Sequence, residues 1–189
     1  MNFEDVYNEF NEKIGRYLQR MVGKNDAEDV TQEVFLKIDK ALNGFEGKSS
    51  LSTWVYRIAT NTAIDKIRGR SSCQEKVSLD TAGDEGINIE EKSLSAEREA
   101  IRNEMTECIR EFIDRLSTDY RTIIILSEIK DLKNQEIADI LEASLDTVKI
   151  RLHRARTRLK AEFEAGCDFY QDEDGGLACD RKKPKKKPE

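Results

Sequence analysis

The sequence predicts an all-α protein: two small helical bundles joined by a flexible acidic linker, with a helix-turn-helix in the second bundle. Apolar residues recur at helical spacing through most of the 189 residues, both prolines lie within the last six residues, and residues 73–95 interrupt the periodicity. We therefore predict a first domain over 1–72, a linker over 73–95, a second domain over 96–165 and a disordered tail over 166–189.

Three helices are predicted in the first domain. Phe3–Val22 carries apolar residues on one helical face, and the segment Gly23-Lys24-Asn25 ends it. Asn25 is the expected N-cap of the next helix, Asp26–Leu42. A third helix runs from about Ser50 to Gly69, after a glycine-containing turn.

The linker separates these helices from a second periodic region. Residues 73–99 carry three basic and eight acidic side chains, and residues 73–95 show no sustained period, which indicates a flexible segment. Helices are predicted again from Ala96, then over Thr118–Lys130, Asn134–Leu141 and Ser144–Ala165.

The composition argues against several classes of function. Lysine and arginine number 32, aspartate and glutamate 38, and the net charge is −6, so total charge does not favour nucleic acid. No run reaches the roughly 18 apolar residues that a membrane helix needs, and the N-terminus is acidic, so we expect a soluble, cytoplasmic protein. The single histidine and four cysteines without a C-x-x-C pair predict no catalytic triad, zinc finger or cofactor.

One local charge pattern stands against the acidic background. Thr147–Lys160 contains six basic residues and no acidic one. On a helix capped by Ser144, an apolar face (Val148, Leu152, Ala155 and Leu159) leaves a basic face on the other side. The residues expected on or beside that basic face are Thr147, Lys149, Arg151, Arg154 and Arg158. Because arginine pairs with guanine and lysine with phosphates, this face predicts reading of the DNA major groove.

Three segments together resemble bacterial sigma factors of the extracytoplasmic-function group, in the sigma-70 family. The helix-turn-helix region 119–156 resembles that group's second conserved domain. The segment DAEDVTQEVFLK at 26–37 resembles its polymerase-binding helix, and STWVYRIATNTAID at 52–65 resembles its promoter-melting helix. Glu142 departs from the glycine common in the family's turn, and a non-glycine residue at positive φ costs about 1 kcal/mol.

The resemblance implies a non-enzymatic transcription initiation factor. Its implied partners are core RNA polymerase, through the clamp coiled coil of the largest subunit, promoter DNA and, as a further candidate, an anti-sigma factor. The polymerase-binding candidates are Asp29, Gln32, Glu33 and Leu36. The first-domain DNA-binding candidates are Trp54, Arg57, Asn61 and Arg68, although Trp54 alone fits a core position equally well. A stand-alone helix-turn-helix regulator is the alternative, but it has no need of the first-domain segments.

Two interpretations of the tail stay open. Its final lysines fit a disordered segment that attracts phosphates. Cys167 and Cys179, each followed by an aspartate, are candidates for sensing a soft metal or redox state, although they lack the close spacing of a typical metal pair.

Overall fold

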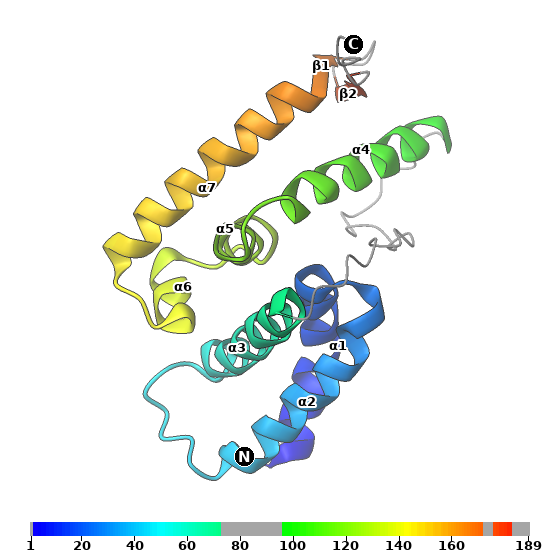
Figure 1. Cartoon of the computed structure of the whole chain (residues 1–189). Coiled ribbons are helices and arrows are strands. Elements are labelled where there is room, and N and C mark those ends of the chain that lie inside the picture. Colours follow the sequence, from blue (N-terminus) through cyan, green and yellow to red (C-terminus); the bar gives the residue numbers. More distant parts are fainter. Residues whose placement is uncertain (1, 73–95, 172–175, 183–189) are drawn as a thin grey trace.

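Helices make up almost all of the computed structural model, which describes residues 2–72, 96–171 and 176–182 (Figure 1). The predicted linker, 73–95, and the lysine-rich end of the tail, 183–189, lie outside the described residues. The first half of the chain forms α1 (Phe3–Val22), α2 (Lys24–Leu42) and α3 (Leu51–Ser72). The predicted all-α class is confirmed, with one small hairpin added.

Helix α2 begins two residues earlier than predicted, at Lys24 instead of Asp26. Asn2 caps α1, since its side chain accepts a hydrogen bond of 2.8 Å from the Asp5 amide. Gly23, with φ of 87°, ends α1 and serves as the N-cap of α2, so Asn25 lies inside α2 and does not cap it. A positive φ is accessible to glycine without steric cost, which allows the sharper turn.

The second half forms α4 (Ala96–Asp114), α5 (Thr118–Ile124), the π-helical segment η1 (Ile125–Ile129), α6 (Asn134–Leu141) and α7 (Leu145–Gly166). The segment 118–130 was expected to be one regular α-helix. Its second part is wound more widely, and the Lys130 amide donates to the Ile125 carbonyl, five residues back.

The helix-turn-helix has the predicted turn and cap. Ser144 accepts a hydrogen bond from the Thr147 amide at 3.2 Å and so caps α7. Glu142 adopts the left-handed conformation, with φ of 50°, at the end of α6. The chain therefore keeps the turn that glycine normally favours, and Glu142 carries its steric cost of about 1 kcal/mol.

The sequence predicted a disordered tail over 166–189, but part of this tail forms two strands. Strands β1 (Cys167–Gln171) and β2 (Leu177–Arg181) pair antiparallel, with Cys167 opposite Arg181 and Phe169 opposite Cys179. The hairpin follows α7 directly and packs next to α4 (Figure 1). Phe169 meets the Phe163 ring of α7, with ring centroids 6.1 Å apart, so the strand has an apolar surface to pack against. A segment only five residues long, with one buried residue followed by four exposed ones, was too short to recognise as a strand.

A single apolar core joins the two halves. It extends from Phe10, Ile14 and Leu18 on α1 to Ile123 and Leu126 on α5 and η1. Helix α3 lies between the α1–α2 pair and the second half, and it contacts α1, α2, α5 and α6 (Figure 1). Its Thr60 side chain is fully buried and hydrogen-bonds the Tyr17 hydroxyl at 2.8 Å. None of the helices in the described part of the chain is long and apolar enough to cross a membrane.

Candidate functional site

The predicted protein-binding patch lies on one exposed side of α2. Asp29, Gln32, Glu33 and Leu36 are all exposed, while Val30, Val34 and Ile38 of the same helix are buried. Leu36 is 61% exposed, so it adds an apolar side chain to this otherwise polar face. Glu33 pairs with Lys37 at 2.7 Å, and Lys37 also donates to Thr62 on α3, so the patch is anchored at one edge.

An aromatic depression extends this patch toward α1. Phe3, Tyr7, Gln32, Phe35, Leu36 and Asp39 line it. The ring centroids of Tyr7 and Phe35 lie 4.8 Å apart in an edge-on arrangement, and Tyr7 remains 40% exposed. Phe3 and Tyr7 belong to the apolar residues of Phe3–Val22, which the sequence places on one helical face. Helical periodicity could not reveal their partial exposure, because it depends on where α2 stops covering α1.

The predicted stripe on α3 is only partly exposed. Asn61 and Arg68 are exposed, and Arg57 is half-buried. Trp54 was placed on this exposed stripe, and that placement is wrong: it is 9% exposed and packs on Phe45, with ring centroids 5.1 Å apart. The reason is that α3 is covered on more than one side, so a single-faced pattern underestimates its buried surface.

The basic face of α7 is arranged as predicted. Val148, Leu152 and Ala155 are buried, and Thr147, Lys149, Arg154 and Arg158 are exposed on the remaining surface. Arg151 is half-buried. The helix begins with a satisfied cap and packs against α5 and α6, so its basic side chains project from a rigid support.

Ion pairs divide the basic residues of α7 into two groups. Arg156 pairs with Glu128 at 2.7 Å, Arg158 with Glu162 at 2.9 Å, and Lys160 with Glu164 at 3.6 Å. Within the described residues, Lys149, Arg151 and Arg154 form no ion pair. The group nearest the start of α7 is therefore the one whose positive charge is most available to an anionic ligand.

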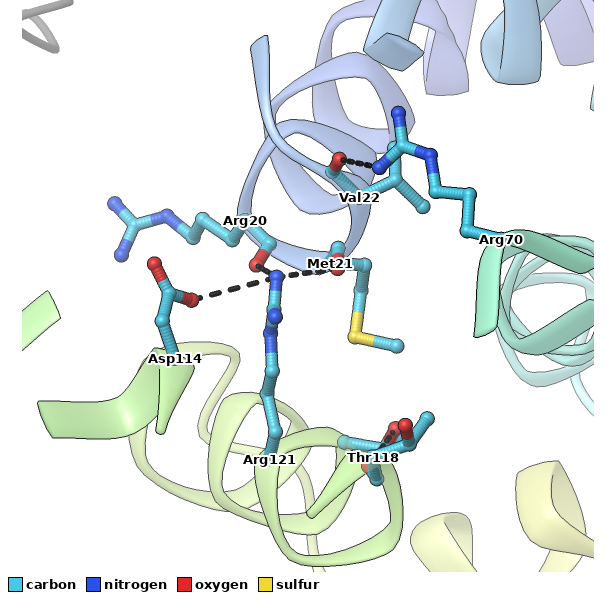
Figure 2. Close-up of polar contacts among 8 residues, drawn as sticks. Arg20, Met21, Val22, Arg70, Asp114, Thr118 and Arg121 are labelled. Carbon is cyan, nitrogen blue, oxygen red and sulfur yellow. Dashed lines mark hydrogen bonds and ion pairs between the residues drawn. The ribbon is translucent and has the colours of Figure 1, made fainter. Parts of the chain in front are cut away.

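Arg121 of α5 joins the two halves at the end of α1 (Figure 2). Its Nη2 donates to the backbone carbonyls of Arg20, at 3.0 Å, and Met21, and lies 3.3 Å from a carboxylate oxygen of Asp114. From α3, Arg70 donates to the next carbonyl, that of Val22, at 3.2 Å. The last carbonyls of a helix lack partners within it and carry partial negative charge, so two guanidinium groups satisfy this end of α1.

Burial changes the titration of this contact. Burial lowers the pKa of Arg121, and the nearby Asp114 opposes that change. Burial likewise raises the pKa of Asp114, against the opposing effect of Arg121. Each group thus keeps the other charged inside a half-buried interface, and removing one leaves the other without its partner.

Lys130 makes a second contact between the halves. Its Nζ lies 6.0 Å from the ring centre of Tyr17 and 5.9 Å from that of Tyr56, and it donates to the Lys13 carbonyl at 3.4 Å. Burial, with smaller effects from Arg20 and Arg16, lowers the pKa of Lys130 to about 8. Arg57 on α3 adds a third contact, since it lies 3.5 Å from the carboxylate of Glu142 in the helix-turn-helix.

The predicted residues therefore form separate faces and no single cleft. One is the α2 patch, a second is the exposed part of α3, and the third is the start of α7. Among the described residues, no cluster of three or more histidine, cysteine, aspartate or glutamate side chains could hold a metal ion. These surfaces suit the docking of large partners better than the binding of a small molecule.

Comparison with family models identifies both halves. The model described as Sigma-70 region 2 matches residues 6–73, and that described as Sigma-70, region 4 matches residues 106–159. The α2 patch and the α3 stripe lie within the first match, and the α6–α7 pair lies within the second. The hairpin follows the end of the second match.

Known proteins match nearly the whole chain. The ECF RNA polymerase sigma factor SigW of Bacillus subtilis is 33% identical over 166 residues, which cover 85% of this chain and 88% of that protein. The ECF RNA polymerase sigma-E factor of Haemophilus influenzae is 30% identical over 165 residues, covering 86% and 87%.

Solved structures share the fold. The sigma factor RpoE of Bartonella quintana, solved with the anti-sigma factor NepR, matches with a TM-score of 0.62 at 23% identity, covering 86% of this chain and 96% of that one. CnrH, solved with the cytosolic domain of CnrY, matches with a TM-score of 0.60 at 22% identity, covering 86% and 88%.

Proposed function

Since this chain belongs to the extracytoplasmic-function sigma factors of the sigma-70 family, we propose how its faces divide the work of initiating transcription. As a sigma factor it binds core RNA polymerase and directs it to promoters. A stand-alone helix-turn-helix regulator would need only the second half, and the match of region 2 over residues 6–73 therefore favours the sigma factor. Because the polymerase and the chromosome of a bacterium lie in the cytoplasm, we propose that the protein acts there. We also propose that it binds these partners without catalysing a reaction.

The α2 patch is the proposed polymerase contact. Asp29, Gln32, Glu33 and Leu36 present carboxylates, an amide and one exposed leucine on a single face, beside the aromatic depression containing Tyr7. An apolar centre with a polar rim is the usual composition of a protein interface. We assign this face to the clamp coiled coil of the largest polymerase subunit, and an anti-sigma factor is a further proposed partner.

Two DNA contacts are proposed. Asn61 and Arg68 on α3, with Arg57 once it is released from Glu142, would hold the melted strand of the minus-ten element. Thr147, Lys149, Arg151, Arg154 and Arg158 on α7 would enter the major groove at the minus-thirty-five element. The proposed domain division remains 1–72, 73–95 and 96–165, with one DNA contact in each of the two folded parts.

Promoter binding requires the two halves to separate. The two elements are about 25 base pairs apart, or roughly 85 Å along the duplex at 3.4 Å per base pair. In the structure, α3 and α6 are in contact and Arg57 pairs with Glu142. We therefore propose that this closed arrangement belongs to the free protein, and that binding to polymerase opens it.

The direct test is run-off transcription with core polymerase and a genomic promoter library, with and without the protein. We expect discrete start sites that depend on the added protein. Asp29→Lys with Glu33→Lys should remove them, because the reversed charges lie on the proposed polymerase face. Glu9→Lys with Glu12→Lys, an exposed pair on α1, is the charge-matched control. If both double variants support transcription equally, the α2 assignment is wrong.

A further inference from the structure

Three cysteines from distant parts of the chain meet beside the hairpin. Cys108 on α4 and Cys167 at the start of β1 are both buried, with their sulfur atoms 3.6 Å apart. Cys179 on β2 is half-buried, packs against the same cluster and hydrogen-bonds to the Cys167 thiol. The cluster is closed by the rings of Phe112 and Phe163, whose centroids are 5.3 Å apart.

Hairpin register places the sulfur atoms together. Cys167 pairs with Arg181, and Phe169 with Cys179, so these four residues share one face of the two-stranded sheet. Arg181 fastens that face to α4, where it forms an ion pair with Glu111 and hydrogen-bonds the Cys108 sulfur. Gly166 allows the close approach, because a Cβ there would collide with the Phe112 ring.

The chemistry of this cluster favours a covalent bond over a metal ion. Cys108 and Cys167 sulfur atoms at 3.6 Å must approach by about 1.6 Å to reach the roughly 2.0 Å of a disulfide. A structural zinc site needs four ligands, whereas three cysteines meet here among the described residues, and their group is not one that could hold a metal ion.

We propose that Cys108 and Cys167 form a reversible disulfide, with the more exposed Cys179 as the thiol that first meets a peroxide oxidant. Cys179 attacks one peroxide oxygen, the O–O bond breaks, and a sulfenic acid and one water remain. Cys167 then attacks the Cys179 sulfur, and its S–O bond breaks to release a second water. Cys108 finally attacks Cys167 and displaces Cys179, which takes up the Cys108 proton. In total, two thiols lose two electrons and two protons, and one hydrogen peroxide becomes two waters.

The surroundings make this a slow, selective reaction. Burial raises the pKa of Cys167 to about 12 and raises the pKa of Cys179 above its ordinary value, so both thiols are protonated at neutral pH. Thiols, unlike thiolates, react slowly with oxidants. The site therefore responds to sustained oxidation, and the Arg181 guanidinium lies beside the Cys108 sulfur, which attacks in the last step.

The disulfide would close the helix-turn-helix half into a covalent loop. The segment between Cys108 and Cys167 contains α5, α6 and α7. A bond closing so long a loop restricts the unfolded chain strongly and should raise the melting temperature by about 5 °C or more. The bond lies at the C-terminal end of α7, away from the DNA face at its start. Cys167 also follows the matched region 4, which ends at residue 159, so the device is an addition to that domain.

Mass spectrometry of the full-length protein tests the proposal. Reduced protein is exposed to hydrogen peroxide, remaining thiols are alkylated, and the protein is digested with trypsin and with a protease that cleaves before aspartate. The second protease is essential, because no lysine or arginine separates Cys167 from Cys179, whereas Asp168 follows Cys167 directly. We expect a loss of about 2 Da that thiol reductants reverse, a Cys108–Cys167 cross-link, and the higher melting temperature.

Single variants separate the roles. Cys108→Ser and Cys167→Ser should each abolish the thermal shift, Cys179→Ser should slow cross-linking several-fold without changing the final link, and Cys73→Ser is the matched control. The proposal is overturned if the mapped link involves Cys73, if only Cys167–Cys179 forms, or if the thiols are oxidised singly. Stoichiometric Zn²⁺ or Cu⁺ that protects all three thiols from alkylation would also overturn it.

Discussion

Arg57 on α3 and Glu142 in the turn of the helix-turn-helix lie 3.5 Å apart, so a proposed DNA-strand contact is held by the other half of the same molecule. The pair is largely exposed, with 34% and 66% of the two side chains accessible, and contributes at most about 1 kcal/mol. Its importance lies in competition, because the carboxylate of Glu142 offsets the positive charge that Arg57 would otherwise offer to a phosphate.

Two substitutions at Glu142 separate the ion pair from the backbone cost. Glu142→Gln removes the charge and keeps a side chain at φ of 50°, so the free energy of unfolding should fall by up to about 1 kcal/mol. Glu142→Gly also relieves the left-handed conformation and should regain about 1 kcal/mol. Urea unfolding measures both. If the glycine variant is the less stable of the two, the backbone at this turn carries no cost.

Arg121 should hold the halves together more strongly than Arg57. Arg121→Met preserves much of the volume but removes donors to the Arg20 and Met21 carbonyls and leaves Asp114 half-buried without its cation. We expect a loss of about 2 kcal/mol in the free energy of unfolding and a larger radius of gyration in small-angle scattering. Arg115→Met is the control, since Arg115 is exposed and, among the described residues, forms its ion pair with Glu111 of its own half. An unchanged radius would show that Arg121 is not needed for closure.

The pH dependence of closure should reveal Lys130. In the open or unfolded chain this amine holds its proton up to a pKa of about 10.5, whereas in the closed structure its pKa is about 8. Between these values the unfolded state binds more protons, so the contribution of Lys130 to stability increases as pH rises. Below about pH 8 both states are protonated, and the burial penalty of the charged amine is present in full.

The variant Lys130→Met isolates the contribution of the Lys130 amine, because methionine does not titrate. The stability of the wild type relative to Lys130→Met should rise from about pH 8 to about pH 10. The window ends there because the amine of the unfolded chain, with a pKa of about 10.5, then also loses its proton, so the two states no longer differ in bound protons. A difference that stays constant over the window would mean that Lys130 is not buried in solution.

Local patterns predicted most of the helices, and tertiary contacts account for the errors. The Ser144 cap and the buried face of Val148, Leu152 and Ala155 depend on neighbours close in sequence, so both could be read correctly. Trp54 could not, because its burial depends on packing around α3 that periodicity does not describe.

The cysteine cluster shows the same limit. Cys108 and Cys167 are 59 residues apart in sequence, and only the docking of a five-residue strand on α4 brings them together. Neither the length nor the spacing of these segments carries that information. The sequence drew attention to Cys167 and Cys179 as a pair, whereas the structure adds Cys108 of α4, whose sulfur lies 3.6 Å from that of Cys167.

Opening of the promoter should depend on Asn61. This side chain is exposed on α3, where an amide can hydrogen-bond the edge of an unpaired base. Asn61→Ala should reduce the open complex more than the initial polymerase–promoter complex, because only the open complex presents an unpaired base. Permanganate reactivity of the bubble, compared with filter binding of the closed complex, measures the two separately. Equal reactivity to the wild type would remove Asn61 from the strand contact.

The start of α7 should read sequence, while its far end should only attract phosphate. Arg151 and Arg154 form no ion pair within the described residues, whereas Lys160 lies nearer the C-terminal end and pairs with Glu164. Arg151→Ala or Arg154→Ala should cost about 1–3 kcal/mol at one base pair of the minus-thirty-five element and relax the preference there. Lys160→Ala should weaken all promoters alike and lower the salt dependence by about one counterion.

The comparison belongs in the assembled holoenzyme, because a single helix-turn-helix makes few contacts and, in the structure, α6 of this helix-turn-helix is in contact with α3. Activity is measured on promoters mutated base by base in the upstream element, at two salt concentrations. Substituting a base-reading arginine should have no effect on the one mutated promoter that lacks the base it contacts. Substituting a phosphate-binding arginine should lower activity equally on every promoter of the series. If Arg151→Ala and Arg154→Ala lower activity equally throughout the series, both residues bind the backbone. Sequence reading must then come from other side chains of α7, with Thr147 and Lys149 as the next to test.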